Sequence, residues 1–172
     1  MITAVILATG ASMNQRIADY VKGKAVVIAV SDAFNLAPWA DALVSADAAW
    51  WQANPEALQF SGDKFGAMPE HQKIGGVERV TDYPTGLNSG LLACQVAVEY
   101  FDAGLVLLCG FDMGGDHYFG KHDKDGLTNT KPERFEEFKR QFERANIPAT
   151  VINCTPNSAL KFYDFEHLEA IL

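Results

Sequence analysis

Short, uninterrupted apolar runs recur along the chain. They cover residues 3–8, 24–30, 42–45, 105–109 and 149–154. Runs of this length without polar alternation are typical of strands that are buried on both faces, as in a parallel sheet. Segments with helical periodicity lie between several of them, and this alternation predicts an α/β fold. We expect one Rossmann-like domain over residues 1–172, a three-layer sandwich with a mostly parallel central sheet.

Two helices are predicted to begin at loops that follow apolar runs or turns. Ser12 is placed to cap a short helix that ends near Tyr20, and Asn88 or Ser89 is placed to cap an apolar helix over residues 91–101. The first-turn amides of a helix have no partner inside it and the dipole is positive there, so each start is a place for a phosphate. For the first helix, a plain turn between strand and helix is an equally good interpretation.

Two further helices are predicted in the second half of the chain. Residues 131–146 are amphipathic, and Phe135, Phe138 and Phe142 recur there at helical spacing. Such a stripe indicates core packing rather than a cofactor site. Residues 164–172 form the last expected helix.

Residues 52–84 show no clear periodicity and hold several glycines and prolines. Within them, residues 76–80 fit a short strand. We interpret the remainder as an irregular excursion or lid, because long irregular segments inside compact domains are often functional. His71 and Lys73 fall in this segment and are best explained as parts of a solvated loop.

Composition disfavours several classes of protein. The chain has 172 residues, of which 48% are hydrophobic and 21% charged, a globular balance. Its net charge of −8 disfavours a protein whose main task is to grip a phosphate backbone. The three cysteines lie in apolar segments and predict reduced core thiols, hence a cytoplasmic protein. The apolar N-terminal run lacks the basic residues of a signal peptide, and no run is long enough to cross a membrane.

The stretch that follows the fourth apolar run holds the densest chemistry. The run breaks at Gly110 and is followed by Asp112, Asp116, His117 and His122. In open α/β sheets, ligands bind outside the carboxyl ends of the strands. Histidine titrates near neutral pH and is flanked here by carboxylates, so this loop is the predicted chemical centre. Hydrogen bonding within the loop is the simpler interpretation of the two histidines.

Polar residues also follow the other predicted strands. Asp32 and Asp47 come directly after the second and third runs. Asp32 lies where dinucleotide-binding folds place a ribose-binding carboxylate, and a role as a cap for the following turn is at least as good an interpretation. Tryptophans nearby would stack on a base or sugar, or belong to the core, which is the commoner role; they are Trp39, Trp50 and Trp51.

Four short motifs, in chain order, resemble those of the bacterial lipooligosaccharide sialyltransferases. They are Gly10-Ala11-Ser12, Asn88-Ser89-Gly90, Gly110-Phe111-Asp112 followed by His117-Tyr118-Phe119-Gly120, and Cys154-Thr155-Pro156-Asn157-Ser158. The whole chain, including residues 32–34 and 37–41, is more similar still to a family of small phage and prophage proteins thought to share a Rossmann-like fold. The archaeal hydroxymethylpterin pyrophosphokinases resemble the pattern more distantly.

The resemblance implies a nucleotide site and a general base. His117 matches the position of the base, and either Tyr118 or Tyr83 would replace the tyrosines that steady the leaving phosphate. Thr9 and Ser31 stand where the sialyltransferases have asparagines, and the acceptor lid of that family is largely missing. The nucleotide is expected to be held by Thr9, Gly10, Ala11, Ser12, Ser31, Asp32, Asp47, Asn88, Ser89, Gly90, Thr155, Pro156, Asn157 and Ser158.

Three functions follow as hypotheses. The first is a glycosyltransferase-like enzyme that uses a nucleotide-activated donor such as a CMP-sugar and requires no metal, with His117 as the base, oriented by Asp112 or Asp116. Its acceptor would be a cell-surface glycan or a modified phage DNA base.

The second hypothesis is a metal-dependent phosphoryl or pyrophosphoryl transferase. A divalent ion such as Mg²⁺ would be held by Asp112, Asp116, His117 and His122. The third is a non-catalytic phage protein that binds a nucleotide in the host cytoplasm. All three predict a small-molecule nucleotide ligand, and whether the chain forms a homo-oligomer stays open.

Overall fold

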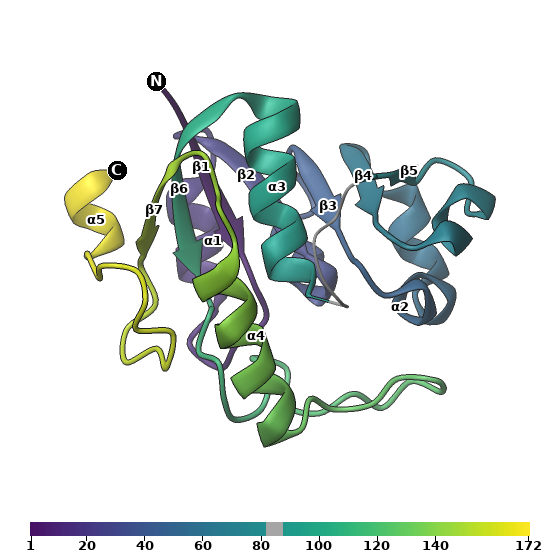
Figure 1. Ribbon diagram of the computed structural model, residues 1–172. Coiled ribbons are helices and arrows are strands. Elements are labelled where there is room, and N and C mark those ends of the chain that lie inside the picture. The colour runs from purple at the N-terminus through teal and green to yellow at the C-terminus, as the bar shows by residue number, and fades with distance from the viewer. Residues whose placement is uncertain (82–87) are drawn as a thin grey trace.

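The computed structural model of the protein describes residues 1–81 and 88–172. Within these residues the chain forms one sheet of seven parallel strands in the order β5-β4-β3-β2-β1-β6-β7 (Figure 1). The strands are β1 (Ile2–Leu7), β2 (Val26–Val30), β3 (Ala42–Val44), β4 (Asp63–Gly66), β5 (Glu78–Arg79), β6 (Ala103–Cys109) and β7 (Thr150–Asn153). The expected α/β fold with a parallel sheet is confirmed.

Helices cover both faces of this sheet. On one face lie α3 (Ser89–Phe101) and α4 (Pro132–Arg144), and on the other lies α1 (Gln15–Val21) (Figure 1). The second face also carries α2 (Ala48–Ala53). The remaining helical segments are short: 3-10 helices η1 (Ser31–Asn35), η2 (Pro55–Gln59) and η3 (Pro69–Lys73), and the C-terminal α5 (Leu168–Ile171).

Strand β1 shows why these runs form a sheet buried on both faces. Ala4 and Ile6 point into the core beneath α3, whereas Val5 and Leu7 point into the core beneath α1 and α2. All four side chains are fully buried. A strand in this position needs apolar residues at every position, and the continuous runs in the sequence reflect this.

The order of the strands creates a switch point between β1 and β6. From β1 to β5 the chain adds each strand on the same side of the one before it. It then crosses back through α3 and adds β6 on the other side of β1. In open α/β sheets the crevice at the carboxyl ends of two such strands is where ligands bind.

Residues 52–84 were the least predictable part, and the described portion is more regular than expected. Instead of an irregular excursion, it adds β4 and β5 to the edge of the sheet. Lys64 pairs with Leu43 in β3, and Phe65 pairs with Val44. Strand β5, with two residues, lies within the short strand predicted at residues 76–80. Strand β4 was not predicted, because it has four residues and half of them are polar.

Helix boundaries also differ from expectation. Asn14, not Ser12, caps α1, because its side-chain oxygen accepts a hydrogen bond from the Ile17 amide at 3.1 Å. The C-terminal helix is confined to α5 instead of spanning residues 164–172. The end of α3 agrees with the predicted helix over residues 91–101: its last residue is Phe101, and its C-cap Asp102 has a positive φ of 52°. In the described part of the chain, every helix is too short or too polar to cross a membrane.

Candidate functional site

A cavity of about 220 Å³ lies at the switch point. It is formed by the loops that follow β1, β2, β3 and β6, by the start of α3, and by the segment that leads into α4. Loops far apart in sequence meet here because the carboxyl ends of parallel strands share one edge of the sheet. The predicted residues that line it are Thr9, Gly10, Ser31, Asp32, Asp47, Asn88, Ser89, Gly90, Asp112, Asp116, His117 and His122.

Two loops are locked together at the floor of this cavity. The Asp112 carboxylate accepts hydrogen bonds from the Ser12 hydroxyl at 2.8 Å and from the Ser12 amide at 3.2 Å. The Gly10 amide donates to the Gly110 carbonyl at 2.9 Å. A Cβ on residue 10 would lie 2.0 Å from an Asp112 carboxylate oxygen and 2.4 Å from the Gly110 carbonyl. Only glycine fits at position 10. Ser12 binds Asp112 of the β6 loop and does not line the cavity.

His117 sits beside this contact, where the β6 loop pairs with the β1 loop. Its Nδ1 lies 2.8 Å from the Thr9 hydroxyl, and its backbone forms a bridge with Gly10. The ring stacks on Phe119, with ring centres 4.8 Å apart and planes 4° from parallel, and the His122 ring lies 4.7 Å away. The imidazole is therefore held in one orientation by its neighbours.

Burial lowers the pKa of His117 below the ordinary value of 6.5, and the positive charge that His122 can carry lowers it further. The carboxylates of Asp32 and Asp116 oppose this shift in pKa with smaller effects. Because the pKa lies below 6.5, His117 is mostly neutral at pH 7. A neutral imidazole in a partly buried cavity is able to accept a proton.

Tyr118 points away from the cavity. Its hydroxyl donates to the Asp32 carbonyl at 2.7 Å, and its amide donates to the Thr9 carbonyl at 2.9 Å. Burial, together with the Asp32 charge, raises the pKa of this tyrosine to about 12. Tyr118 thus joins the ends of β1 and β2 to the β6 loop, and it does not line the cavity. Tyr83, the other tyrosine considered for the leaving phosphate, lies outside the described residues.

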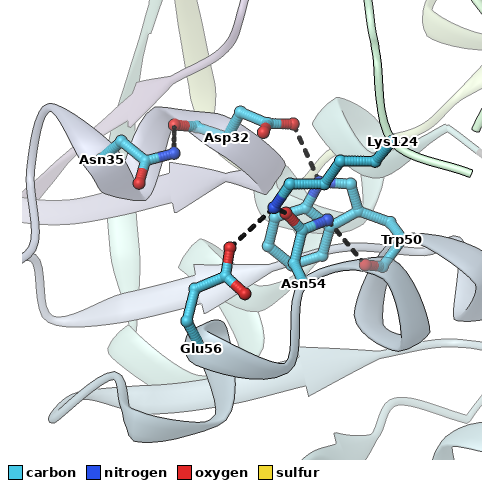
Figure 2. A network of polar contacts seen from close by, with 6 residues as sticks. All are labelled: Asp32, Asn35, Trp50, Asn54, Glu56 and Lys124. Atoms are coloured by element: carbon cyan, nitrogen blue, oxygen red, sulfur yellow. Dashed lines mark hydrogen bonds and ion pairs between the residues drawn. The ribbon is translucent and has the colours of Figure 1, made fainter.

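The end of β2 presents Ser31 and Asp32. Ser31 has a positive φ of 47°, and its hydroxyl donates to the Ser45 hydroxyl at 3.1 Å. One oxygen of the Asp32 carboxylate accepts from the Trp50 indole at 2.8 Å (Figure 2). Trp50 is buried, so the indole fixes this carboxylate at the cavity wall. Asp47 caps α2 by accepting from the Ala49 amide at 2.9 Å.

The start of α3 forms another wall. Asn88 caps the helix by accepting from the Leu91 amide at 3.1 Å, and its amide group donates to Gln141 of α4 at 3.0 Å. The Ser89 hydroxyl accepts from the Ala46 amide at 2.9 Å. A Cβ on Gly90 would lie 2.6 Å from the Phe111 ring. Phe111 therefore makes the close approach at residue 90, and Gly90 also lines the cavity.

The residues after β7 lie beneath the β6 loop, outside the cavity. The Thr155 hydroxyl accepts from the Phe111 amide at 2.9 Å, and the Ser158 hydroxyl donates to the Phe111 carbonyl at 2.5 Å. Both are buried, and they hold the backbone just before Asp112. Pro156 and Asn157 are exposed. Of the predicted nucleotide-binding residues, those that do not line the cavity are Ala11, Ser12, Thr155, Pro156, Asn157 and Ser158.

Apart from His122, the residues of the outer wall were not predicted from the sequence. The outer wall consists of residues 121–130, which we call the outer segment, and of two phenylalanines at the start of α4. Phe135 and Phe138 line the cavity and are only half-buried, so the predicted core role is wrong for them and right for Phe142. Helical spacing places the three phenylalanines on one face of α4. It does not indicate that part of this face lines a cavity instead of the core.

Lys124 ties the outer segment to the residues that follow α2. Its ammonium group donates to the side chains of Asn54 and Glu56, the latter at 2.7 Å (Figure 2). Asn54 in turn donates to the Trp50 carbonyl at 2.8 Å (Figure 2). One chain of contacts thus runs from the outer segment through α2 to the carboxylate of Asp32.

The cavity is acidic. Its charged lining residues are Asp32, Asp47, Asp112 and Asp116, and none of the lining residues in the described part of the chain is a lysine or arginine. Within residues 1–81 and 88–172, no group of three or more histidine, cysteine, aspartate or glutamate side chains is arranged to hold a metal ion. The metal-dependent hypothesis thus lacks a preassembled set of ligands among these residues.

Comparison of the chain with protein-family models, with curated proteins and with solved structures finds no match.

Proposed function

We propose that the protein binds a nucleotide in the switch-point cavity and transfers a group from a nucleotide-activated donor, in the manner of a glycosyltransferase. The observation that carries the proposal is the position of His117. A histidine whose pKa is lowered by burial lines a cavity at the site where open α/β sheets bind ligands. No other described histidine except His122 lines this cavity.

His117 would act as the general base. When Nδ1–H donates to the Thr9 hydroxyl, which lies 2.8 Å away, the proton-accepting nitrogen is Nε2. That nitrogen would take the proton from an acceptor hydroxyl as the hydroxyl oxygen attacks the donor carbon, the bond from that carbon to the phosphate oxygen breaks, and the nucleotide leaves with the electron pair. The stacked ring of Phe119 supports the orientation that this transfer needs. Asp112 is occupied by Ser12, so it would hold the loop rather than orient the imidazole.

The cavity suits a donor that carries one phosphate better than a donor that carries several. The four aspartates of the cavity wall would repel a diphosphate or triphosphate, and the lining residues of the described chain include no lysine or arginine to offset that charge. The start of α3 would receive a single phosphate, because a helix N-terminus carries a partial positive charge. A CMP-sugar, in which one phosphate joins the nucleoside and the sugar, fits these conditions.

Thermal-shift measurements with a panel of nucleosides, nucleotides and nucleotide sugars test the binding premise. At about 100 times its Kd, a ligand stabilises the folded protein by about 2.7 kcal/mol. We expect a shift with at least one CMP-containing ligand in the presence of EDTA. No shift with any nucleotide, with or without Mg²⁺, would refute nucleotide binding altogether.

The catalytic role is tested by His117→Asn. Asparagine can keep the hydrogen bond to Thr9 but cannot accept a proton, so transfer should fall by about a hundredfold or more. The nucleotide Kd should change little. His167→Asn is the matched control, because His167 is exposed and does not line the cavity. Binding without transfer by the wild-type protein, across donors and acceptors, would favour the non-catalytic nucleotide-binding alternative.

A further inference from the structure

Two cysteines face a second cavity that the proposed function does not use. Cys109 ends β6 and Cys154 follows β7, and both line a hollow of about 240 Å³ on the α1 side of the sheet. Arg16 and Glu169 line the same hollow, and their side chains are exposed. All three cysteines are free thiols, as the sequence predicts, but these two have a shared environment that the sequence does not reveal.

The register of the sheet brings the two thiols together. Leu108 pairs with Asn153, and the ladder continues because the Cys154 amide donates to the Leu108 carbonyl at 2.8 Å. Cys109 and Cys154 are therefore neighbours on adjacent strands, with side chains in the same core. Adjacent strands lie about 4.8 Å apart, and disulfides span Cα separations of about 4.4–6.8 Å.

The two thiols are not equivalent. A hydrogen bond between them raises the pKa of Cys109, together with burial, and lowers the pKa of Cys154. Burial and the carboxylates of Glu166 and Glu169 oppose the lowering at Cys154. Of the two thiols, Cys154 is therefore the one that ionises more readily. Cys154 is also the more exposed of the pair, at 7% against 2%.

We propose that Cys154 and Cys109 form a peroxide-reactive dithiol that closes reversibly to a disulfide between β6 and β7. The Cys154 thiolate attacks one oxygen of the peroxide, the O–O bond breaks, and Cys154 becomes a sulfenic acid while hydroxide leaves and takes up a proton. The Cys109 sulfur then attacks the Cys154 sulfur, releases its own proton, and displaces hydroxide. With hydrogen peroxide the sum is two thiols oxidised to one disulfide and one peroxide reduced to two waters.

The pair lies at the base of the candidate site. Cys109 directly precedes Gly110, and Thr155, the neighbour of Cys154, accepts the hydrogen bond from the Phe111 amide. The disulfide would cross-link the two strands whose ends hold this loop. The proposal does not depend on nucleotide binding, because its readout is the state of the thiols.

The test is oxidation of the folded full-length protein with hydrogen peroxide, followed by mass spectrometry of its peptides. We expect an intramolecular disulfide between Cys109 and Cys154 that dithiothreitol reverses, with Cys94 still reduced. Cys94 is the internal control, because it is fully buried on the opposite face and burial raises its pKa. Before oxidation, iodoacetamide should label Cys154 roughly tenfold faster than Cys94.

Two variants separate the roles of the thiols. In Cys109→Ser, Cys154 should stop at the sulfenic acid and be trapped by dimedone, whereas in Cys154→Ser, Cys109 should stay reduced. Cys94→Ala should leave disulfide formation unchanged. If the wild-type protein forms only intermolecular disulfides, or if the three thiols react only after denaturation, the proposal is wrong. The last two outcomes are measured on the wild-type protein, so they test the proposal even if a variant fails to fold.

Discussion

The two halves of the segment between β6 and α4 are attached to the molecule in different ways. Residues 110–120, the inner segment, are joined to the β1 loop by several short contacts through Gly10, Ser12 and Thr9. The outer segment, residues 121–130, makes its described hydrogen bonds to other elements through one side chain, Lys124. The side chains of Lys124 and its partner Glu56 are 40% and 54% exposed.

The difference separates two tasks within one loop. For the proposed transfer, His117 would have to be held within a fraction of an ångström of the productive geometry, and the contacts of the inner segment with the β1 loop favour this. A wall that admits and releases a ligand must instead open at low cost, and exposed ion pairs contribute little to stability. We therefore expect the chemistry to depend on the inner segment and access to depend on the outer one.

The largest effect on the inner segment is expected from Gly10→Ala. The new Cβ would meet the Asp112 carboxylate at 2.0 Å and the Gly110 carbonyl at 2.4 Å, so the two loops would have to separate. We expect a loss of about 3 kcal/mol in the free energy of unfolding, measured by urea denaturation. Gly114→Ala is the matched control within the inner segment, because its Cβ would have no neighbour within 4 Å.

At residue 114 alanine should be neutral or slightly stabilising, since it restricts the unfolded chain. If the two variants lose the same stability, the contact between the β1 loop and the inner segment does not fix the loop as we infer.

The sequence is sufficient for the interior strands of this fold. The run at residues 105–109 predicts β6, observed at Ala103–Cys109, because a strand buried on both faces leaves an unbroken apolar signature. Strands β4 and β5 leave no such signature, since both are short and they expose Asp63 and Glu78. Their pairing depends on the neighbouring strand, which local sequence cannot report.

The candidate site was predictable to a similar degree. The loops that follow the strands converge as the parallel topology requires, so Gly10, Asp32 and His117 meet at one cavity. Which side chains enter the cavity was not predictable, because loop geometry decides it. Ser12 turns to Asp112 and Tyr118 turns to the Asp32 carbonyl, and neither contact leaves a local sequence signal.

The inner segment should also make stability depend on pH through His117. Burial and His122 lower the pKa of His117 in the folded state, whereas the unfolded chain protonates near the ordinary value of 6.5. Between the two pKa values the unfolded state binds more protons, so stability falls as the pH falls from 6.5 toward the folded pKa. Urea denaturation at a series of pH values measures this slope.

His117→Asn should reduce the slope in that window, because the substituted chain no longer takes up this proton on unfolding. His167→Asn, at an exposed position outside the cavity, is the control for removing a histidine. An unchanged slope in His117→Asn would mean that this imidazole is not held in its neutral form.

The smallest effect on stability is expected at the outer segment. Glu56→Ala removes the ion pair with Lys124 and should cost less than about 1 kcal/mol of global stability. Local opening should nevertheless become easier, so trypsin should cleave after Lys121 a few times faster in the native protein. Glu136→Ala removes a partly exposed ion pair with Lys139 on α4, away from the outer segment, and should leave cleavage after Lys121 unchanged. Equal cleavage rates in the two variants would show that Lys124 does not hold the outer segment. Faster cleavage in Glu56→Ala alone would identify the ion pair between Lys124 and Glu56 as the contact that must break for the cavity to open.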